Sequence, residues 1–156
     1  MSSFAPAWPK EEFEVDQKRA AIAKAAWSWL NTPFLDCQRL KGVGVDCANL
    51  PVAVLKEAIG MEVRLPVYSP QVYLHKLGDS TFLDTIMSCC REIEEKAVAM
   101  GDFVLYRVAK SYTHGGVVIS WPDQVIHPLR NRGVIISHGL NEGFLKNRPH
   151  RFFTVF

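Results

Sequence analysis

The stretch GVVISWPDQVIH, residues 116–127, holds two short apolar runs separated by a turn. The runs at 116–120 and 124–127 are rich in β-branched residues, which pack well on a pleated strand. Pro122-Asp123 between them is typical of a turn. The stretch therefore predicts an antiparallel β-hairpin.

This hairpin brings two histidines onto one sheet, His114 just before its first strand and His127 at the end of its second. A turn centred on 122–123 pairs His127 with Val118, and because side chains alternate between faces, both histidines share a face. A flat ladder leaves them about 13 Å apart, at about 3.3 Å per residue. Contact between the two imidazoles therefore requires a bulge at 115–116 or a shifted turn, and glycine in a strand is typical of a bulge.

Further runs of the same character continue the predicted sheet. They lie at 103–107, 134–137 and 151–156. With the hairpin they predict four to five antiparallel strands. In the N-terminal half, apolar residues recur with helical spacing and predict helices at 11–30, 47–60, 71–77 and 80–95. Helices followed by strands indicate the α+β class, with the helices packed on a small, curved antiparallel sheet.

Composition and charge limit the classes of protein to which this chain can belong. Its 156 residues are 48% hydrophobic, so we expect a single domain over residues 1–156, with residues 1–10 as an N-terminal extension. A formal net charge of +2 is too small for a nucleic-acid-binding surface. No apolar run reaches the roughly 18 residues of a membrane span, and the start lacks the pattern of a secretory signal. We therefore expect no membrane insertion and a protein that is cytoplasmic as synthesised.

The cysteines indicate neither a disulfide framework nor a zinc site. Four are present, and their spacing matches no metal-ligand pattern: Cys37, Cys47, Cys89 and Cys90. The glycine-rich motifs of nucleotide-binding proteins and the paired histidines of zinc hydrolases are also missing from the sequence. We therefore expect no metal and no cofactor, and a special cysteine would have to act as a nucleophile.

Cys47 is the candidate nucleophile because it follows the glycine-containing loop GVGVD, residues 42–46, and precedes a predicted helix. A helix N-terminus stabilises a thiolate over a thiol and is expected to lower the pKa of the cysteine. Its backbone N–H groups can also hold an oxyanion. The alternative at this point is that Cys47 is a small buried hydrophobic residue.

His114 and His127 are the candidate partners of Cys47. If the two imidazoles meet, Cys47 attacks, His114 moves the proton and His127 fixes the tautomer of His114. The alternative is that both are surface residues at strand ends. The remaining histidines are expected to be solvated, in loops or on a helix: His75, His138 and His150.

Six segments, taken in order, resemble the NlpC/p60 cysteine peptidases, which are papain-like cell-wall hydrolases. They lie at 26–34, 41–50, 66–70, 101–106, 114–119 and 125–127. The resemblance covers residues 20–156 and is strongest to short members encoded with phage-tail and gene-transfer-agent genes. It implies the roles named above for Cys47, His114 and His127, with the Cys47 backbone amide contributing to the oxyanion hole. It also places Asp46 and Phe34 beside that hole.

Three residues depart from the family pattern. Phe34 replaces a tyrosine whose hydroxyl reaches the cysteine region, Asn49 stands where a small glycine is common, and Pro51 lies in the first turns of the nucleophile helix. Such a proline costs a helical hydrogen bond unless it falls among the first, unpaired N–H groups. The helix is therefore expected to begin slightly later or to be distorted.

The resemblance implies hydrolysis of an amide in peptidoglycan stem peptides, after γ-D-glutamate. Since the sequence shows no export or wall-binding segment, action at the cell wall is expected to follow delivery by a virion, a secretion apparatus or lysis, with phage-tail or secretion proteins as partners. Two alternatives stay open. One is a tail structural or assembly protein with little catalysis, and the other is a thiol amidase or acyltransferase that acts on a different substrate.

Overall fold

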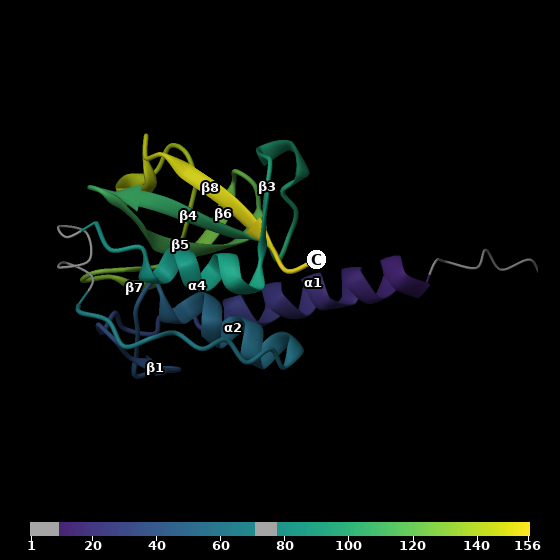
Figure 1. Cartoon of the computed structure of the whole chain (residues 1–156), viewed down its shortest axis with the longest axis horizontal. Coiled ribbons are helices and arrows are strands. Elements are labelled where there is room, and N and C mark those ends of the chain that lie inside the picture. The colour runs from purple at the N-terminus through teal and green to yellow at the C-terminus, as the bar shows by residue number, and fades with distance from the viewer. Residues whose placement is uncertain (1–9, 71–77) are drawn as a thin grey trace, which may run out of the picture.

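The computed structural model describes residues 10–70 and 78–156. Within these ranges helices form one layer and a six-stranded sheet the other (Figure 1). The helices are α1 (Lys10–Ser28), α2 (Asn49–Ile59) and α4 (Thr81–Cys89). The predicted α+β arrangement of helices on an antiparallel sheet is confirmed. The helix expected at 71–77, with His75, and nearly all of the expected N-terminal extension lie outside the described residues.

The main sheet is antiparallel throughout, with the strand order β3-β8-β4-β5-β6-β7. Its strands are β3 (Arg91–Ile93), β4 (Phe103–Val108), β5 (Ser111–Ser120), β6 (Gln124–Leu129), β7 (Gly133–Ser137) and β8 (His150–Thr154). A separate ribbon pairs β1 (Arg39–Leu40) with β2 (Gly44–Val45). The hairpin predicted from residues 116–127 is formed by β5 and β6.

The prediction of four to five strands is wrong by one, because the edge strand β3 lies within the helix predicted at 80–95. Helix α4 ends at Cys89, and Cys90 is extended, with φ −128° and ψ 153°. The next residues pair with β8, where both contacts between the Glu92 carboxylate and the Arg151 guanidinium measure 2.8 Å. Pairing with a strand distant in the sequence outweighs the local helical pattern.

The main sheet buries apolar side chains on both faces. The face toward the helices carries the larger core, which includes Phe103 and Phe153. The opposite face carries a smaller cluster that includes Tyr106 and Val118. Since side chains alternate along a strand, His114 lies on the same face of β5 as Val118.

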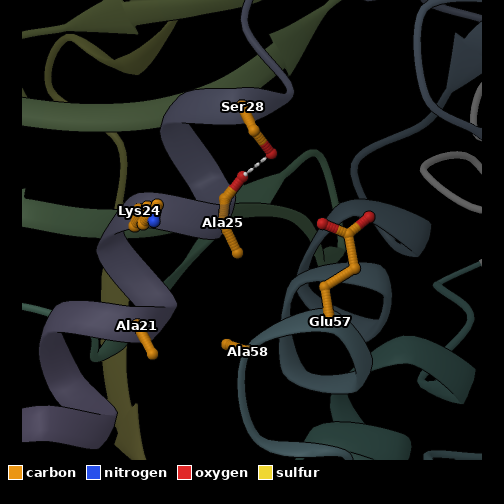
Figure 2. A pocket seen from close by; sticks show the side chains of 6 residues that line it. All are labelled: Ala21, Lys24, Ala25, Ser28, Glu57 and Ala58. Atoms are coloured by element: carbon orange, nitrogen blue, oxygen red, sulfur yellow. Dashed lines mark hydrogen bonds between the residues drawn. The ribbon is translucent and has the colours of Figure 1, made fainter.

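Helices α1 and α2 lie side by side and approach each other through small side chains. Ala21 and Ala25 of α1 lie across from Ala58 of α2, and a shallow hollow of about 310 Å³ separates them (Figure 2). The N-terminal part of α1 extends beyond the sheet (Figure 1). Across residues 10–70 and 78–156, no helix combines the length and apolar character needed to cross a bilayer.

Candidate active site

The N-terminus of α2 is capped by the carboxylate next to the candidate nucleophile. The Asp46 carboxylate accepts hydrogen bonds from the backbone N–H groups of Ala48, at 3.2 Å, and Asn49, at 2.9 Å. These N–H groups have no partner within a helix, so the carboxylate stabilises the start of α2. Cys47 is thereby held just before the helix, as the sequence predicted.

Helix α2 accommodates the proline that departs from the family pattern. The helix begins at Asn49, two residues after Cys47, which confirms the later start expected from Pro51 and makes Pro51 its third residue. Its missing N–H therefore falls in the first turn, and the helix loses no interior hydrogen bond. At the other end the helix ends at Ile59, and Gly60 follows with a left-handed φ of 67°, as expected for a glycine after a helix.

Cys47 lies between α2 and β5 with its side chain almost wholly buried, at 2% exposure. Its Sγ donates a hydrogen bond to the Thr113 carbonyl oxygen at 3.2 Å, one residue before His114. Gly115 permits this approach, since a Cβ on Gly115 would lie 2.7 Å from the Cys47 carbonyl oxygen. The strand that carries the candidate base therefore also binds the thiol.

The expectation that the pKa of Cys47 is lowered by the helix N-terminus is wrong for the resting protein. Burial raises the pKa of the thiol, and the nearby Asp46 carboxylate raises it further. Backbone N–H groups of Gly115 and of Cys47 itself act in the opposite direction but do not cancel the rise. The resting sulfur is therefore a protonated thiol at neutral pH.

His114 and His127 meet on the face of the sheet that points away from the helices. The two side chains are 4% and 1% exposed, and His114 Nε2 lies 2.8 Å from His127 Nδ1. The half-buried Phe144 ring covers His114, with ring centroids 4.8 Å apart. The alternative of two histidines exposed at strand ends is wrong.

A shifted turn, one of the two routes left open by the sequence, brings the histidines together. Val118 pairs with Val125 rather than with His127, and the register shifts between Val118 and Ser120. The same register carried along the strands sets Gly116 opposite His127, where a Cβ on the glycine would lie 3.5 Å from the His127 Cβ. His114 then lies two residues from this position, within diagonal reach of His127.

Ser137 of β7 completes a line of three buried polar side chains, and the sequence analysis did not single it out. Its Oγ lies 2.8 Å from His127 Nε2, and the side chain is buried. Ile135 is the strand partner of His127, and Ser137 follows two residues later on the same face. The signal that could have identified it is a serine at the end of an otherwise apolar predicted strand, residues 134–137.

This line of contacts favours one distribution of protons. If His127 Nε2–H donates to Ser137 Oγ, its Nδ1 accepts from His114 Nε2–H, and His114 Nδ1 is then the acceptor for a proton from Cys47. Burial lowers the pKa of His127 to about 4, and the positive charge of Arg132 adds to the effect. His127 is therefore neutral at pH 7, as this arrangement requires.

A second polar network surrounds the Asp46 carboxylate. The Tyr68 hydroxyl donates to Asp46, and Asn49 Nδ2 donates to the Tyr68 oxygen at 2.6 Å and to Asp46 at 3.0 Å. Arg39 Nε in turn donates to Asn49 Oδ1 at 3.0 Å, and the Cys37 N–H donates to Asp46 at 2.7 Å. Asp46 thus holds the loop and the helix start together, and Asn49 has a polar role that a glycine would lack.

Phe34 lies in the loop that leads to Cys47 but makes no polar contribution. It forms a parallel bridge with Val45, and the Arg130 guanidinium lies 4.7 Å from the centre of its ring. A tyrosine at position 34 would supply a hydroxyl that Phe34 lacks, but the hydroxyl of Tyr68 reaches Asp46 in this protein. Tyr68 lies in the segment 66–70 after α2, and its contact with Asp46 could not be predicted because it depends on how that segment packs against the loop.

The other cysteine and histidine side chains among the described residues take no part in the line formed by His114, His127 and Ser137. Cys37 is exposed, and the half-buried Cys89 and Cys90 have Sγ atoms 3.7 Å apart. His138 lies in a turn as expected, whereas His150 begins β8 and packs against Trp121, so the prediction of a loop residue is wrong for His150. Among residues 10–70 and 78–156, no group of three histidine, cysteine or acidic side chains is placed to hold a metal ion.

Comparison with known proteins gives a likeness in structure alone. No family model and no curated protein sequence matches the chain. The NlpC/p60 domain of the peptidoglycan hydrolase SagA aligns with a TM-score of 0.62 at 16% identity, covering 85% of this chain and 96% of that one. The chain has the NlpC/p60 fold. The P60 domain of the Mycobacterium avium subspecies paratuberculosis antigen MAP1204 gives the same TM-score at 17% identity, covering 90% and 96%.

A third structure with the NlpC/p60 fold has a different description. RipD from Mycobacterium tuberculosis, described as a non-catalytic NlpC/p60 domain protein adapted to peptidoglycan binding, aligns with a TM-score of 0.57 at 14% identity. The alignment covers 90% of this chain and 98% of RipD. The NlpC/p60 fold thus occurs both in hydrolases and in a non-catalytic protein. The fold alone therefore does not distinguish catalysis from binding, and the geometry of the site has to be considered.

Proposed function

We propose that this protein is a cysteine hydrolase that cleaves an amide bond in peptidoglycan stem peptides. The observation that carries the proposal is the 2.8 Å contact between the buried side chains of His114 and His127. His114 lies on β5, next to Thr113, whose carbonyl oxygen accepts a hydrogen bond from the Cys47 thiol. The likeness to the NlpC/p60 domain of a peptidoglycan hydrolase supports the choice of substrate. Membership of the NlpC/p60 family is part of the same proposal.

The reaction begins from a neutral thiol. His114 Nδ1 takes the proton of Cys47 as the sulfur attacks the amide carbonyl, and the neutral His127 accepts a hydrogen bond from His114 Nε2–H throughout. The backbone N–H groups of Cys47 and Gly115, which already face the sulfur, are suited to stabilise the oxyanion. His114 then protonates the leaving amine, and water activated by His114 hydrolyses the acyl-enzyme.

The finer assignments rest on the resemblance in sequence. We propose cleavage after γ-D-glutamate and delivery to the cell wall in association with a phage tail or a similar apparatus. Phe34, Asn49 and Pro51 do not argue against activity, because α2 starts where Pro51 is tolerated and Asn49 and Tyr68 supply polar groups beside Cys47.

A non-catalytic peptidoglycan-binding protein is the second candidate, favoured by one observation. The Cys47 thiol is buried, its pKa is raised, and it donates a hydrogen bond to the Thr113 carbonyl oxygen in the resting protein. RipD shows that the NlpC/p60 fold occurs without catalysis. In this case stem peptides would bind without being cut.

Purified stem peptides separate the two candidates. The wild-type protein and a Cys47→Ala variant are incubated with the peptides, and the products are identified by mass spectrometry. Cleavage that requires Cys47 supports the hydrolase and identifies the bond. A Cys37→Ala variant is the matched control and is expected to cleave at the wild-type rate. Binding without cleavage by folded wild-type protein would show the non-catalytic function instead.

Ser137→Ala is expected to lower kcat/KM for stem-peptide cleavage about tenfold, mainly through kcat. Without the Ser137 hydroxyl, His127 Nε2–H loses its acceptor, and His127 can turn its Nδ1 into a donor that no longer supports His114. The pH profile of kcat/KM is therefore expected to shift as well, and Ser137→Thr is expected to restore both. A wild-type profile in folded Ser137→Ala protein would show that the hydroxyl does not position His127.

A further inference from the structure

A polar hollow lies between the loop after α1 and the turn that joins β6 to β7. It has a volume of about 410 Å³. Its lining combines two arginines and two asparagines with an aromatic ring, a proline and a glycine: Asn31, Pro33, Phe34, Arg130, Asn131, Arg132 and Gly133. Among the described residues its lining contains no acidic side chain, whereas one other hollow is lined by Glu11, Glu12 and Asp16 of α1, and the hollow between α1 and α2 includes both Lys24 and Glu57.

The two arginines of the hollow differ in their partners: Arg130 is held by an ion pair, whereas Arg132 can interact with a ligand. Arg130 donates to both carboxylate oxygens of Asp36 at 3.0 Å, and its guanidinium stacks over the Phe34 ring. In contrast, the Arg132 guanidinium has no ion pair or hydrogen-bond partner in the part of the chain that the structure describes. With Asp36 neutralising Arg130, one positive charge remains for a ligand.

The walls of the hollow are held by backbone contacts. The Asn31 N–H donates to the Val134 carbonyl at 3.0 Å, and the Val134 N–H donates to the Thr32 carbonyl at 2.9 Å. Gly133 has φ 77°, and a Cβ there would lie 2.5 Å from the Thr32 carbonyl oxygen. This close approach requires glycine, and it fixes the β6–β7 turn against the loop. A ligand would therefore meet a preformed site.

The two walls of the hollow belong to segments that also carry residues of the candidate active site. Phe34 is bridged to Val45, two residues before Cys47. On the other wall, β6 and β7 extend from the turn to His127 and Ser137. The positive charge of Arg132 acts on His127, so Arg132 lies close enough to the candidate site for a charge on a bound peptide to interact with it.

We propose that this hollow binds a carboxylate of the stem peptide, with Arg132 as its cationic partner. The planar guanidinium can donate two parallel hydrogen bonds to a carboxylate, and a single net charge on the hollow matches a single carboxylate. Asn31 and Asn131 offer further polar contacts around the ligand. Arg132 is then a specificity-determining residue, an assignment that rests on the function proposed above.

The test uses Cys47→Ala protein, so that binding is measured without cleavage. Dissociation constants are determined by calorimetry for a stem peptide and for an analogue whose free carboxylates are carboxamides. Adding Arg132→Gln is expected to weaken binding of the carboxylate peptide about fivefold and to leave binding of the carboxamide analogue unchanged. Arg64→Gln, which removes an exposed arginine elsewhere, is the matched control and is expected to change neither constant.

Each other outcome overturns a defined part of the account. If Cys47→Ala protein binds the carboxylate peptide and the carboxamide analogue equally well, the hollow is not a carboxylate site. The same holds if Arg132→Gln weakens the binding of both peptides equally. Either result leaves the proposed function unaffected. Failure of the folded Cys47→Ala protein to bind any stem peptide overturns the proposed function together with the site.

Discussion

His114→Ala protein is expected to hydrolyse stem peptides at least about a thousandfold more slowly than the wild-type protein. Burial and Asp46 raise the pKa of the Cys47 thiol, so almost no thiolate exists at pH 7 in the absence of a base. A cysteine with a lowered pKa would retain part of its reactivity without the histidine. In this protein the Cys47 thiol has to transfer its proton to His114 as the sulfur attacks the amide carbonyl. Nearly all of the activity therefore depends on His114.

The measurement is kcat/KM for the stem-peptide amide at pH 7, with folding checked by circular dichroism. His138→Ala is the control, because His138 lies in a turn outside the line formed by His114, His127 and Ser137. It is expected to keep wild-type activity. A loss of less than tenfold in folded His114→Ala protein would exclude His114 as the base.

Acidification from pH 7 to pH 4 is expected to remove about 3 kcal/mol of folding free energy through His127 alone. Burial and the Arg132 charge lower the pKa of His127 from its ordinary value of 6.5 to about 4 in the folded protein. Above pH 6.5 the imidazole is neutral in both states, and its stabilising effect is complete. Between pH 6.5 and 4 the unfolded state takes up the proton first, so stability falls with pH.

Urea unfolding at pH 7 and pH 4 measures this loss, with His127→Gln as the comparison because glutamine does not titrate in this range. The groups around the imidazole are His114 from β5, Ser137 from β7 and the charge of Arg132 from the turn. The wild-type protein is expected to lose about 3 kcal/mol more than the variant. An equal loss in both proteins would mean that His127 is protonated as readily in the folded state as in water.

Much of the architecture could be predicted from the sequence because it depends on local patterns. Helix α2 ends just before Gly60 because glycine favours the left-handed conformation that stops a helix, and its N-terminus follows Cys47 closely because the apolar spacing is helical. The β5–β6 hairpin follows from β-branched runs on either side of a Pro-Asp turn. These signals extend over a few residues and need no knowledge of the rest of the fold.

The features that the sequence did not predict depend on pairing and burial. Strand β3 exists because residues near Glu92 pair with β8. The meeting of His114 and His127 depends on a register shift near Ser120, and the role of Ser137 follows from that register. The pKa of Cys47 is set by the protein packed around it, which a helix N-terminus alone does not reveal.

The most direct test of the central claim is to trap the acyl-enzyme. Wild-type protein is mixed with excess stem peptide at low temperature, quenched with acid within the first turnovers, digested and analysed by mass spectrometry. The account predicts that the acyl fragment of the stem peptide is attached to Cys47, and that the adduct is missing from His114→Ala protein. Product formation in the same samples with no adduct on Cys47 would contradict the account.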